Sequence, residues 1–432
     1  MADSTAPAHN TKNRPRDLAV RVLTRVLSDR EPLDEAIAAV AAGLTLTPEN
    51  RAWLQDVCSG TLRWKGRIDA ILDSIALKKK PTGWLRKVLS IAVYQLLAQE
   101  RTHPGLVVSE TVDEVQKKEG KAPASFSNAL LRKVSDHRES WRAFPFPEKG
   151  KALEQAQWAS LPEWLWRRLV SERGVEWARA YAEASLERPT LWVRAKDSAL
   201  SGSGAELFEA GPLPGAYRFS KEVSGAITER AGFHEGRFFV QDVSSQFLIQ
   251  EITLELRKVM GSGPLSVLDL CAAPGGKSVG LAWSGFTVTA TDRDPSRLVL
   301  LKETVARVAP QVQVILREAV EALPLQHCVW VDAPCSGTGI LRRHPDVRWL
   351  RGEKELAGLI KVQSQLLTEA WEKTLPGGML AYSVCSVLRE EGSAAIELFC
   401  SQNKAKIVRE WLLCPQESPG GDGFWAALIR KS

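Results

Sequence analysis

Cysteine is scarce in this chain, which has seven among 432 residues. An odd number at irregular spacing argues against a disulfide framework, and no two cysteines have the C-x2-C spacing of a zinc site. No apolar run approaches the roughly 18 residues that a membrane-spanning helix needs. The N-terminal stretch MADSTAPAHNTKNRPRD lacks the apolar core of a signal peptide. These absences predict a cytoplasmic protein with no membrane segment and no bound metal.

The composition is that of a globular protein, with 44% hydrophobic and 25% charged residues. The length predicts two or three domains, and the chain shows no internal repeat. The formal net charge is +6. The first 140 residues carry 22 Lys and Arg against 17 Asp and Glu, a net of +5. This excess fits either a solvated helical surface or a surface that faces RNA.

The N-terminal part of the chain has the periodicity of helices. We expect a disordered tail over residues 1–15 and a helical domain over 16–142. The stretch RDLAVRVLTRVL places its apolar residues on one stripe, and WLRKVLSIAVYQLL is apolar on most faces. The second stretch is therefore predicted to be the central helix of a bundle.

Two further regions follow a proline-containing linker at 144–151. Residues 150–240 mix helix and strand patterns and predict a small α+β domain that links its neighbours and contacts RNA. Over residues 241–432 short apolar runs alternate with helical stretches, which predicts a doubly wound, mostly parallel α/β sheet. Such sheets bind ligands at the carboxyl ends of their strands.

A strand, a tight turn and a helix start are predicted in VLDLCAAPGGKS. Gly275 and Gly276 permit close approach of a ligand to the backbone, but the turn matches neither a P-loop nor G-x-G-x-x-G. Asp292 ends the next strand, where a carboxylate can accept both hydroxyls of a ribose. An adenosine cofactor without a pyrophosphate, S-adenosyl-L-methionine, fits both observations. The alternative is an ordinary turn in which Asp292 caps a helix.

Two cysteines stand at corresponding strand ends, Cys335 in VDAPCSGTG and Cys385 in YSVCSV. A thiolate can add to carbon-6 of cytosine and so make carbon-5 nucleophilic enough for methylation. Asp332 can then hydrogen-bond the edge of the base. A single cysteine would more often be core packing, which is the reading for Cys58, Cys400 and Cys414. Cys328 is expected inside the sheet and Cys271 in the wall of the cofactor turn.

The turn and both cysteine loops, in this order and spacing, resemble the Sun family of RNA cytosine-5 methyltransferases. The stretches QDVSSQ, GTGILRRHPDVRWLR and DGFWAAL are similar to further signatures of that family, over roughly residues 150–432. The N-terminal helices resemble the RNA-binding NusB fold in SGTLRWKGRID, LSIAVYQLL and FSNALLRK. This fusion is typical of bacterial enzymes that methylate 16S ribosomal RNA.

The resemblance implies a monomeric enzyme that acts on 16S ribosomal RNA, either naked or in an early assembly particle. It assigns nucleophilic attack to Cys385, help in product release to Cys335, and an active-site role to Asp332. The residues it implies in cofactor binding are Cys271, Ala272, Ala273, Pro274, Gly275, Gly276, Lys277, Asp292, Glu318 and Asp332.

The sequence departs from the family pattern at three places. Val384 stands where Thr usually precedes the nucleophile, Arg317 and Glu318 replace Gly-Asp, and Gly392 replaces an Asn. Val384 is expected to point into the fold and to affect packing more than chemistry. Three alternatives stay open: reversed roles for the two cysteines, another RNA substrate such as transfer RNA or 23S ribosomal RNA, and a non-enzymatic ribosome-assembly protein.

Overall fold

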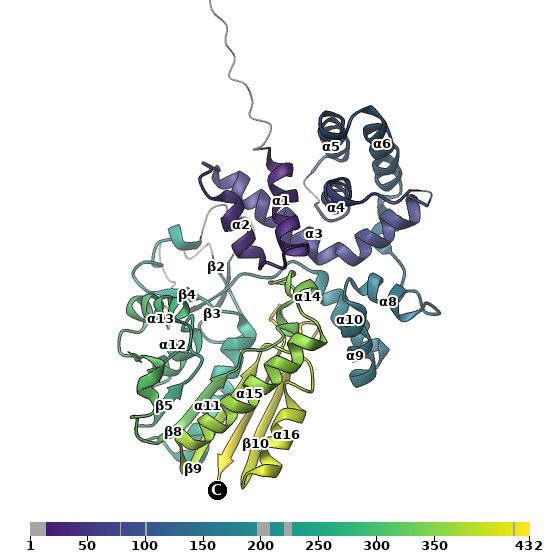
Figure 1. Ribbon diagram of the computed structural model, residues 1–432. Coiled ribbons are helices and arrows are strands. Elements are labelled where there is room, and N and C mark those ends of the chain that lie inside the picture. The colour runs from purple at the N-terminus through teal and green to yellow at the C-terminus, as the bar shows by residue number, and fades with distance from the viewer. Residues whose placement is uncertain (1–13, 78, 100–101, 197–207, 220–226, 418–419) are drawn as a thin grey trace, which may run out of the picture. The chain divides into compact units, whose positions relative to one another are not determined.

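The computed structural model describes residues 14–77, 79–99, 102–196, 208–219, 227–417 and 420–432 (Figure 1). The chain forms two compact units, one of residues 1–186 with 344–352 and one of 187–343 with 353–432. The chain therefore passes between the units three times. The predicted tail over residues 1–15 lies, up to residue 13, outside the described residues. The domain bounds drawn from the sequence stay predictions.

The first unit is entirely helical where the structure describes it, as the periodicity predicts. Ten consecutive residues of α4, from Val88 to Leu97, are buried, which confirms that WLRKVLSIAVYQLL is the central helix. The helices are α1 (Pro15–Leu27), α2 (Leu33–Ala41), α3 (Pro48–Ile75), α4 (Gly83–Ala98), α5 (Pro104–Glu119), α6 (Lys121–Asp136), α7 (Arg138–Ala143), α8 (Ala152–Ala159), α9 (Glu163–Arg173), α10 (Val175–Leu186) and α14 (Val347–Leu350).

Helix α14 comes from the RRHPDVRWLR stretch but packs in the helical unit. The guanidinium of Arg348 is fully buried there and donates to the carbonyl oxygens of Arg63, Ser160 and Ser185, at 3.1, 3.0 and 3.2 Å. Burial lowers its pKa to about 9. The indole of Trp349 donates to the Leu62 carbonyl at 2.8 Å. One arginine therefore ties α3 to the carboxyl ends of α8 and α10.

The second unit contains the predicted sheet. Five strands formed by its short apolar runs are parallel, and two antiparallel strands extend one edge, in the order β10-β11-β9-β8-β5-β6-β7. The strands are β5 (Ser266–Asp269), β6 (Thr287–Ala290), β7 (Gln313–Val314), β8 (Gln326–Asp332), β9 (Thr374–Val384), β10 (Ala405–Leu413) and β11 (Phe424–Lys431).

Helices cover both faces of this sheet (Figure 1). Alternate residues of each strand join two separate apolar cores. One core contains α11 (Val243–Met260), α12 (Gly276–Trp283) and α13 (Pro295–Val308), and the other contains α15 (Glu353–Lys373) and α16 (Ser393–Gln402). The predicted doubly wound α/β fold is confirmed.

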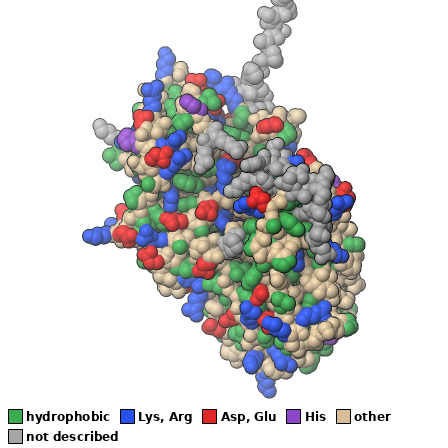
Figure 2. All heavy atoms as spheres, turned by 180° about the vertical axis from the view of Figure 1, so that it is seen from behind, with side chains coloured by type: hydrophobic (Ala, Val, Ile, Leu, Met, Phe, Trp, Pro, Cys, Tyr) green, Lys and Arg blue, Asp and Glu red, His purple; other side chains and the backbone are tan. Residues whose placement is uncertain are grey.

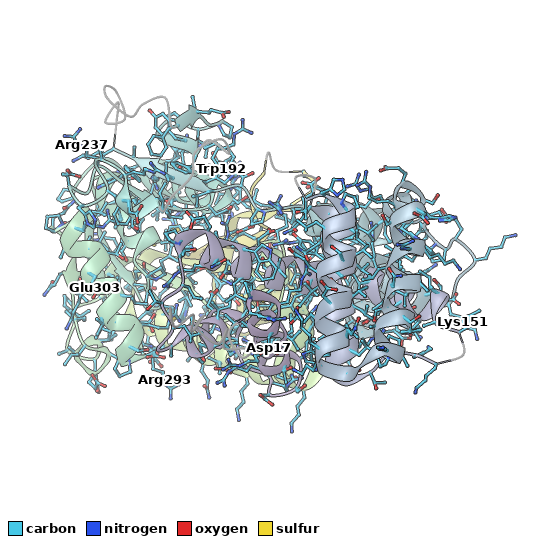
Figure 3. All side chains as sticks on the ribbon, turned by 90° about the horizontal axis from the view of Figure 1, so that it is seen from above. Asp17, Lys151, Trp192, Arg237, Arg293 and Glu303 are labelled. Atoms are coloured by element: carbon cyan, nitrogen blue, oxygen red, sulfur yellow. The ribbon has the colours of Figure 1, made fainter. Side chains whose placement is uncertain are left out.

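A small antiparallel sheet precedes the large one, in the order β2-β3-β1-β4. Its strands are β1 (Trp192–Ala195), β2 (Phe208–Ala210), β3 (Ala216–Phe219) and β4 (Phe238–Val240). Trp192, labelled in Figure 3, donates from its indole to the Gly420 carbonyl at 3.1 Å. Within its described residues the unit also has three short 3-10 turns: Ile227–Glu229, Arg317–Val320 and Thr338–Ile340.

Charges of both signs cover the visible surface. On the face seen in Figure 2, Lys and Arg side chains alternate with Asp and Glu rather than forming one basic field. Within the part of the chain that the structure describes, no helix is long and apolar enough to cross a membrane.

Replacing Arg348 with alanine should destabilise the helical unit by on the order of 3 kcal/mol, because three buried carbonyls lose their donor and a cavity forms. The expected result is a lower urea midpoint together with faster amide hydrogen exchange in α3, α8 and α10. Arg351→Ala is the matched control, since Arg351 lies in the same segment but is exposed. Equal midpoints for the two variants would contradict the assigned role of Arg348.

Candidate functional site

The cofactor turn follows β5 at the carboxyl edge of the sheet. Gly275 has a φ of +110°, a backbone conformation that favours glycine. A side chain on Gly276 would meet the amide of Gln241 at 3.0 Å. Gly275 is therefore favoured by its backbone conformation and Gly276 by its close contact with Gln241. Together with the Asp292 carboxylate, which is bonded to the backbone of this turn, these residues fit the predicted cofactor.

Asp292 is held in the turn rather than at a helix cap. Its carboxylate accepts hydrogen bonds from the Ala273 N–H at 3.2 Å and the Asp294 N–H at 3.1 Å. The cap of α13 is Asp294, which accepts from the Ser296 N–H at 2.8 Å. Arg293, labelled in Figure 3, is exposed, whereas Asp292 is 5% exposed. The helix-cap alternative for Asp292 is therefore wrong, and its ribose role stays a prediction.

Lys277 and Asp332 join the turn to the strand that precedes Cys335. The Lys277 ammonium lies 2.6 Å from one carboxylate oxygen of Asp332. The other oxygen accepts from the Ser383 hydroxyl at 2.7 Å, which in turn accepts from the Trp330 indole at 3.0 Å. Lys277, which the resemblance places in the cofactor turn, is therefore paired with Asp332 in this structure. Both side chains are thereby fixed beside the ends of β8 and β9.

Three further residues near the carboxyl ends of the strands differ in how far their side chains are exposed. Glu318 is exposed in the 3-10 turn after β7, at the same carboxyl edge. Burial raises the pKa of the Cys271 thiol to about 12, so this cysteine forms a wall of the turn and is not a ready nucleophile. Beside it Asp269 is completely buried, and burial raises its pKa to about 7.

The two loop cysteines lie in contact. Strands β8 and β9 pair in parallel with Asp332 opposite Ser383, so the loops that follow them start side by side. The Sγ atoms of Cys335 and Cys385 are 3.1 Å apart. The Gly339 N–H donates to the Cys385 carbonyl at 2.9 Å, and a side chain on Gly339 would clash with the Gly423 carbonyl. The structure brings together Asp332, Cys335 and Cys385 as the spacing predicts.

Contact with Cys385 changes the pKa of the Cys335 thiol. A hydrogen bond with Cys385, burial, and the negative charge of Glu391 all raise its pKa well above the usual value of a thiol. Cys335 is therefore a neutral thiol that can donate to the sulfur of Cys385.

The other cysteines pack as expected, with Cys58, Cys328 and Cys414 buried and Cys400 partly buried. Burial raises the pKa of Cys328 to about 12. Val384, the residue before Cys385, is fully buried in the core under α15 and α16. Val384 therefore points into the fold, as expected, and its effect on packing rather than chemistry stays a prediction.

Three signature stretches meet around one arginine. The Arg343 guanidinium donates to Asp422 at 2.9 Å and to Asp242 at 3.0 Å, and the Asp422 N–H donates to Asp242 at 3.0 Å. Burial, and then the charge of Asp422, raise the pKa of Asp242 to about 6. QDVSSQ, the start of RRHPD and DGFWAAL are therefore parts of one buried ionic cluster.

Known proteins resemble the chain over nearly its whole length. Residues 262–423 match the family of 16S rRNA methyltransferases RsmB/F, and residues 13–136 match the NusB family. Ribosomal RNA small subunit methyltransferase B of Pasteurella multocida is 30% identical, with 96% of each chain covered. The protein of that name from Salmonella arizonae is 29% identical over 97% of this chain and 99% of the relative.

The chain belongs to the RsmB/F family. It is therefore an rRNA methyltransferase that depends on S-adenosylmethionine.

Solved structures confirm the fold of this family member. The crystal structure of PH0851 has a TM-score of 0.70 at 21% identity and covers 97% of this chain and 99% of its own. NSun6 from Pyrococcus horikoshii has a TM-score of 0.53 at 16% identity, over 62% of this chain and 98% of its own.

The sequence reasoning missed the residues that support the cysteine loops, above all Glu391 and Gln363. In the sequence, Glu391 is marked only by its position directly before Gly392, after a second acidic residue. Both side chains are completely buried and bond to the loop of Cys335. In the sequence, Gln363 is marked only as a polar residue at a core position of a helical stretch, and this pattern does not indicate which residue it bonds to.

Because of Asp269, the free energy of unfolding should decrease as pH rises. Its folded pKa of about 7 exceeds the unfolded value, so the stabilisation is complete below about pH 4 and is lost as pH rises through 7. Each pKa unit corresponds to about 1.4 kcal/mol, which makes the total at most a few kcal/mol. Asp269→Asn should remove this slope, measured as the difference in unfolding free energy between pH 5 and 7.5.

Asp294→Asn is the control of opposite sign. Hydrogen bonds from Ser296 lower the pKa of this exposed carboxyl, so Asp294 stabilises the fold above its unfolded pKa and loses that effect in acid. The asparagine variant should therefore lose stability at neutral pH. A wild-type pH slope that survives Asp269→Asn unchanged would contradict the assignment.

Proposed function

We propose that this enzyme methylates carbon-5 of a cytosine in 16S ribosomal RNA through a covalent bond between Cys385 and the base. The observation that carries the proposal is the pair of thiols 3.1 Å apart beside Asp332, at the ends of adjacent parallel strands. The named relatives are small-subunit ribosomal RNA methyltransferases, which supports the choice of RNA. The substrate is naked RNA or an early assembly particle, and the enzyme acts as a cytoplasmic monomer.

The chemistry requires a nucleophile because carbon-5 of cytosine reacts poorly by itself. The sulfur of Cys385 forms a bond to carbon-6, and the electron pair of the 5,6 double bond becomes available at carbon-5. Asp332 hydrogen-bonds the base edge and favours its protonated, electrophilic form. After methylation the carbon-5 proton is lost to water, the double bond forms again, and Cys385 leaves as a thiolate.

Cys335 assists that last step. Its neutral thiol lies in hydrogen-bond contact with the sulfur of Cys385. A donor in this position stabilises the negative charge that develops on the departing sulfur. This division of labour also explains why one site needs two cysteines.

The cofactor supplies an electrophilic methyl group when it is bound. Residues Cys271 to Lys277 would hold it, with Asp292 at the ribose and Glu318 at the adenine. Glu318 is exposed after β7, so its carboxylate is free of the sheet core. Lys277, through its ion pair, also keeps Asp332 aligned with the cysteine loops.

Replacing Cys385 with alanine should lower methyl transfer by roughly a thousandfold or more, because the attacking group is lost. Cys335→Ala should instead accumulate an RNA adduct, seen as a gel shift that resists denaturant. Cys400→Ala is the matched control, a partly buried cysteine on α16 outside the site. Normal turnover by Cys335→Ala would refute this division of labour, and an adduct formed by Cys385→Ala would show reversed roles.

Two rival readings have direct tests. A non-enzymatic assembly protein would fail to bind S-adenosylmethionine in calorimetry. If the chain is the proposed enzyme, it should bind the cofactor, and Asp292→Asn should weaken that binding by roughly tenfold through the lost ribose bonds. Bisulfite sequencing of RNA from cells with and without this gene distinguishes 16S ribosomal RNA from transfer RNA and 23S ribosomal RNA. A lost methylcytosine in one of the other RNAs would overturn the proposed substrate.

A further inference from the structure

Glu391 is a buried carboxylate next to the catalytic loops. It lies just before α16 and is completely buried. Its oxygens accept from the Ser336 N–H at 2.7 Å, from the Ser336 hydroxyl and from the Gln363 amide at 3.0 Å. All three of these donors are neutral, so these hydrogen bonds stabilise the carboxylate without contributing a positive charge. Retaining such a group is costly, which suggests a use for it.

The two side chains hold the backbone on both sides of Cys335. Gln363, on α15, donates from one amide nitrogen both to the Pro334 carbonyl, at 3.0 Å, and to Glu391. Glu391 in turn accepts the N–H of Ser336. The residues before and after Cys335 are therefore fixed by groups that belong to neither cysteine motif.

The same network reaches the loop of Cys385. The Ser386 hydroxyl lies 3.3 Å from the Ser336 hydroxyl and 2.9 Å from that of Thr338. On β9 the Tyr382 hydroxyl donates to the backbone carbonyl of Glu391 at 2.9 Å. Glu391 is thus held by the strand that carries Cys385 while it holds the loop that carries Cys335.

We propose that Glu391 is a positioning residue, which acts with Gln363 to keep the thiol of Cys335 neutral and against the sulfur of Cys385. This inference rests on the proposed function, in which a neutral Cys335 stabilises the departing thiolate. It adds a residue that touches neither base nor cofactor and acts through Cys335 alone.

The charge of Glu391 contributes as well as its geometry. Titratable groups around Cys335 are Cys385 just after β9, Glu391 before α16, Tyr382 within β9 and Asp332 at the end of β8. Contact with Cys385, burial and the charge of Glu391 raise the pKa of Cys335. Removing the carboxylate charge should therefore lower this pKa and convert the donor to a thiolate at lower pH.

The first test does not depend on methyl transfer. In the Cys385→Ala background, alkylation of Cys335 by iodoacetamide is followed against pH by mass spectrometry of its peptide. Adding Glu391→Gln should move the midpoint to lower pH by roughly one unit, while Glu397→Gln, an exposed carboxylate on α16, should not move it. An unmoved midpoint with Glu391→Gln would overturn the charge effect and with it the proposal.

The second test measures release. With Cys385 intact, Glu391→Gln should accumulate more denaturant-resistant RNA adduct than wild type, and increasingly so at higher pH. Gln363→Ala should also accumulate adduct but leave the alkylation midpoint in place, since it loosens the loop without changing charge. Combined with Cys335→Ala, neither change should add further adduct, because both act through Cys335.

The outcomes separate the two proposals. If Cys335→Ala forms no adduct, the proposed function fails, and the alkylation midpoint still decides whether Glu391 controls Cys335. If Cys335→Ala forms adduct but Glu391→Gln and Gln363→Ala match wild type, the positioning role is refuted. A mainly structural role would lower thermal stability without moving the midpoint or the adduct fraction.

Discussion

The parallel pairing of β8 with β9 is the interaction on which the rest of the site depends. Its register sets Asp332 opposite Ser383, so both loops leave the sheet at one level and their cysteines meet at 3.1 Å. A slip of one residue would turn every side chain of the strand to the other face of the sheet. The ion pair between Lys277 and Asp332 then connects this pair of strands to the cofactor turn, two parts of the chain 55 residues apart.

Buried carboxylates gather near this edge of the sheet, and they work against stability. Asp269, Asp242 and Glu391 are each shielded from water and bonded mostly to neutral donors or to one arginine. Burial raises the pKa values of Asp269 and Asp242. A sheet edge built only for stability would carry apolar residues there. The arrangement is consistent with a site in which polar groups are fixed before the substrate arrives.

The sequence was sufficient for much of the fold because the decisive signals are local. Apolar runs and glycine turns predict β5, β6, β7, β8 and β9, and those strand ends already place Cys335 and Cys385 at one edge. The burial of Val384 follows from its place in a central strand that is covered on both faces, because all residues of β9 from 378 to 384 are buried. The supports of Cys335 were not predictable in the same way, since Glu391 bonds to Ser336 from 55 residues away and Gln363 bonds to Pro334 from 29 residues away in the chain. The periodicity of the sequence likewise does not show in which apolar core the side chain of Trp349 packs.

The position of α14 has a consequence for the order in which the protein is made. The helical unit includes residues 344–352, and Arg348 fills its interior with bonds to three of its segments. On the ribosome the N-terminal helices emerge first, but their unit stays incomplete until residue 352 of 432 has been synthesised. Domains usually fold as units during synthesis, with the N-terminal one first. Here the last segment of the first unit, residues 344–352, is synthesised only after residues 187–343 of the second.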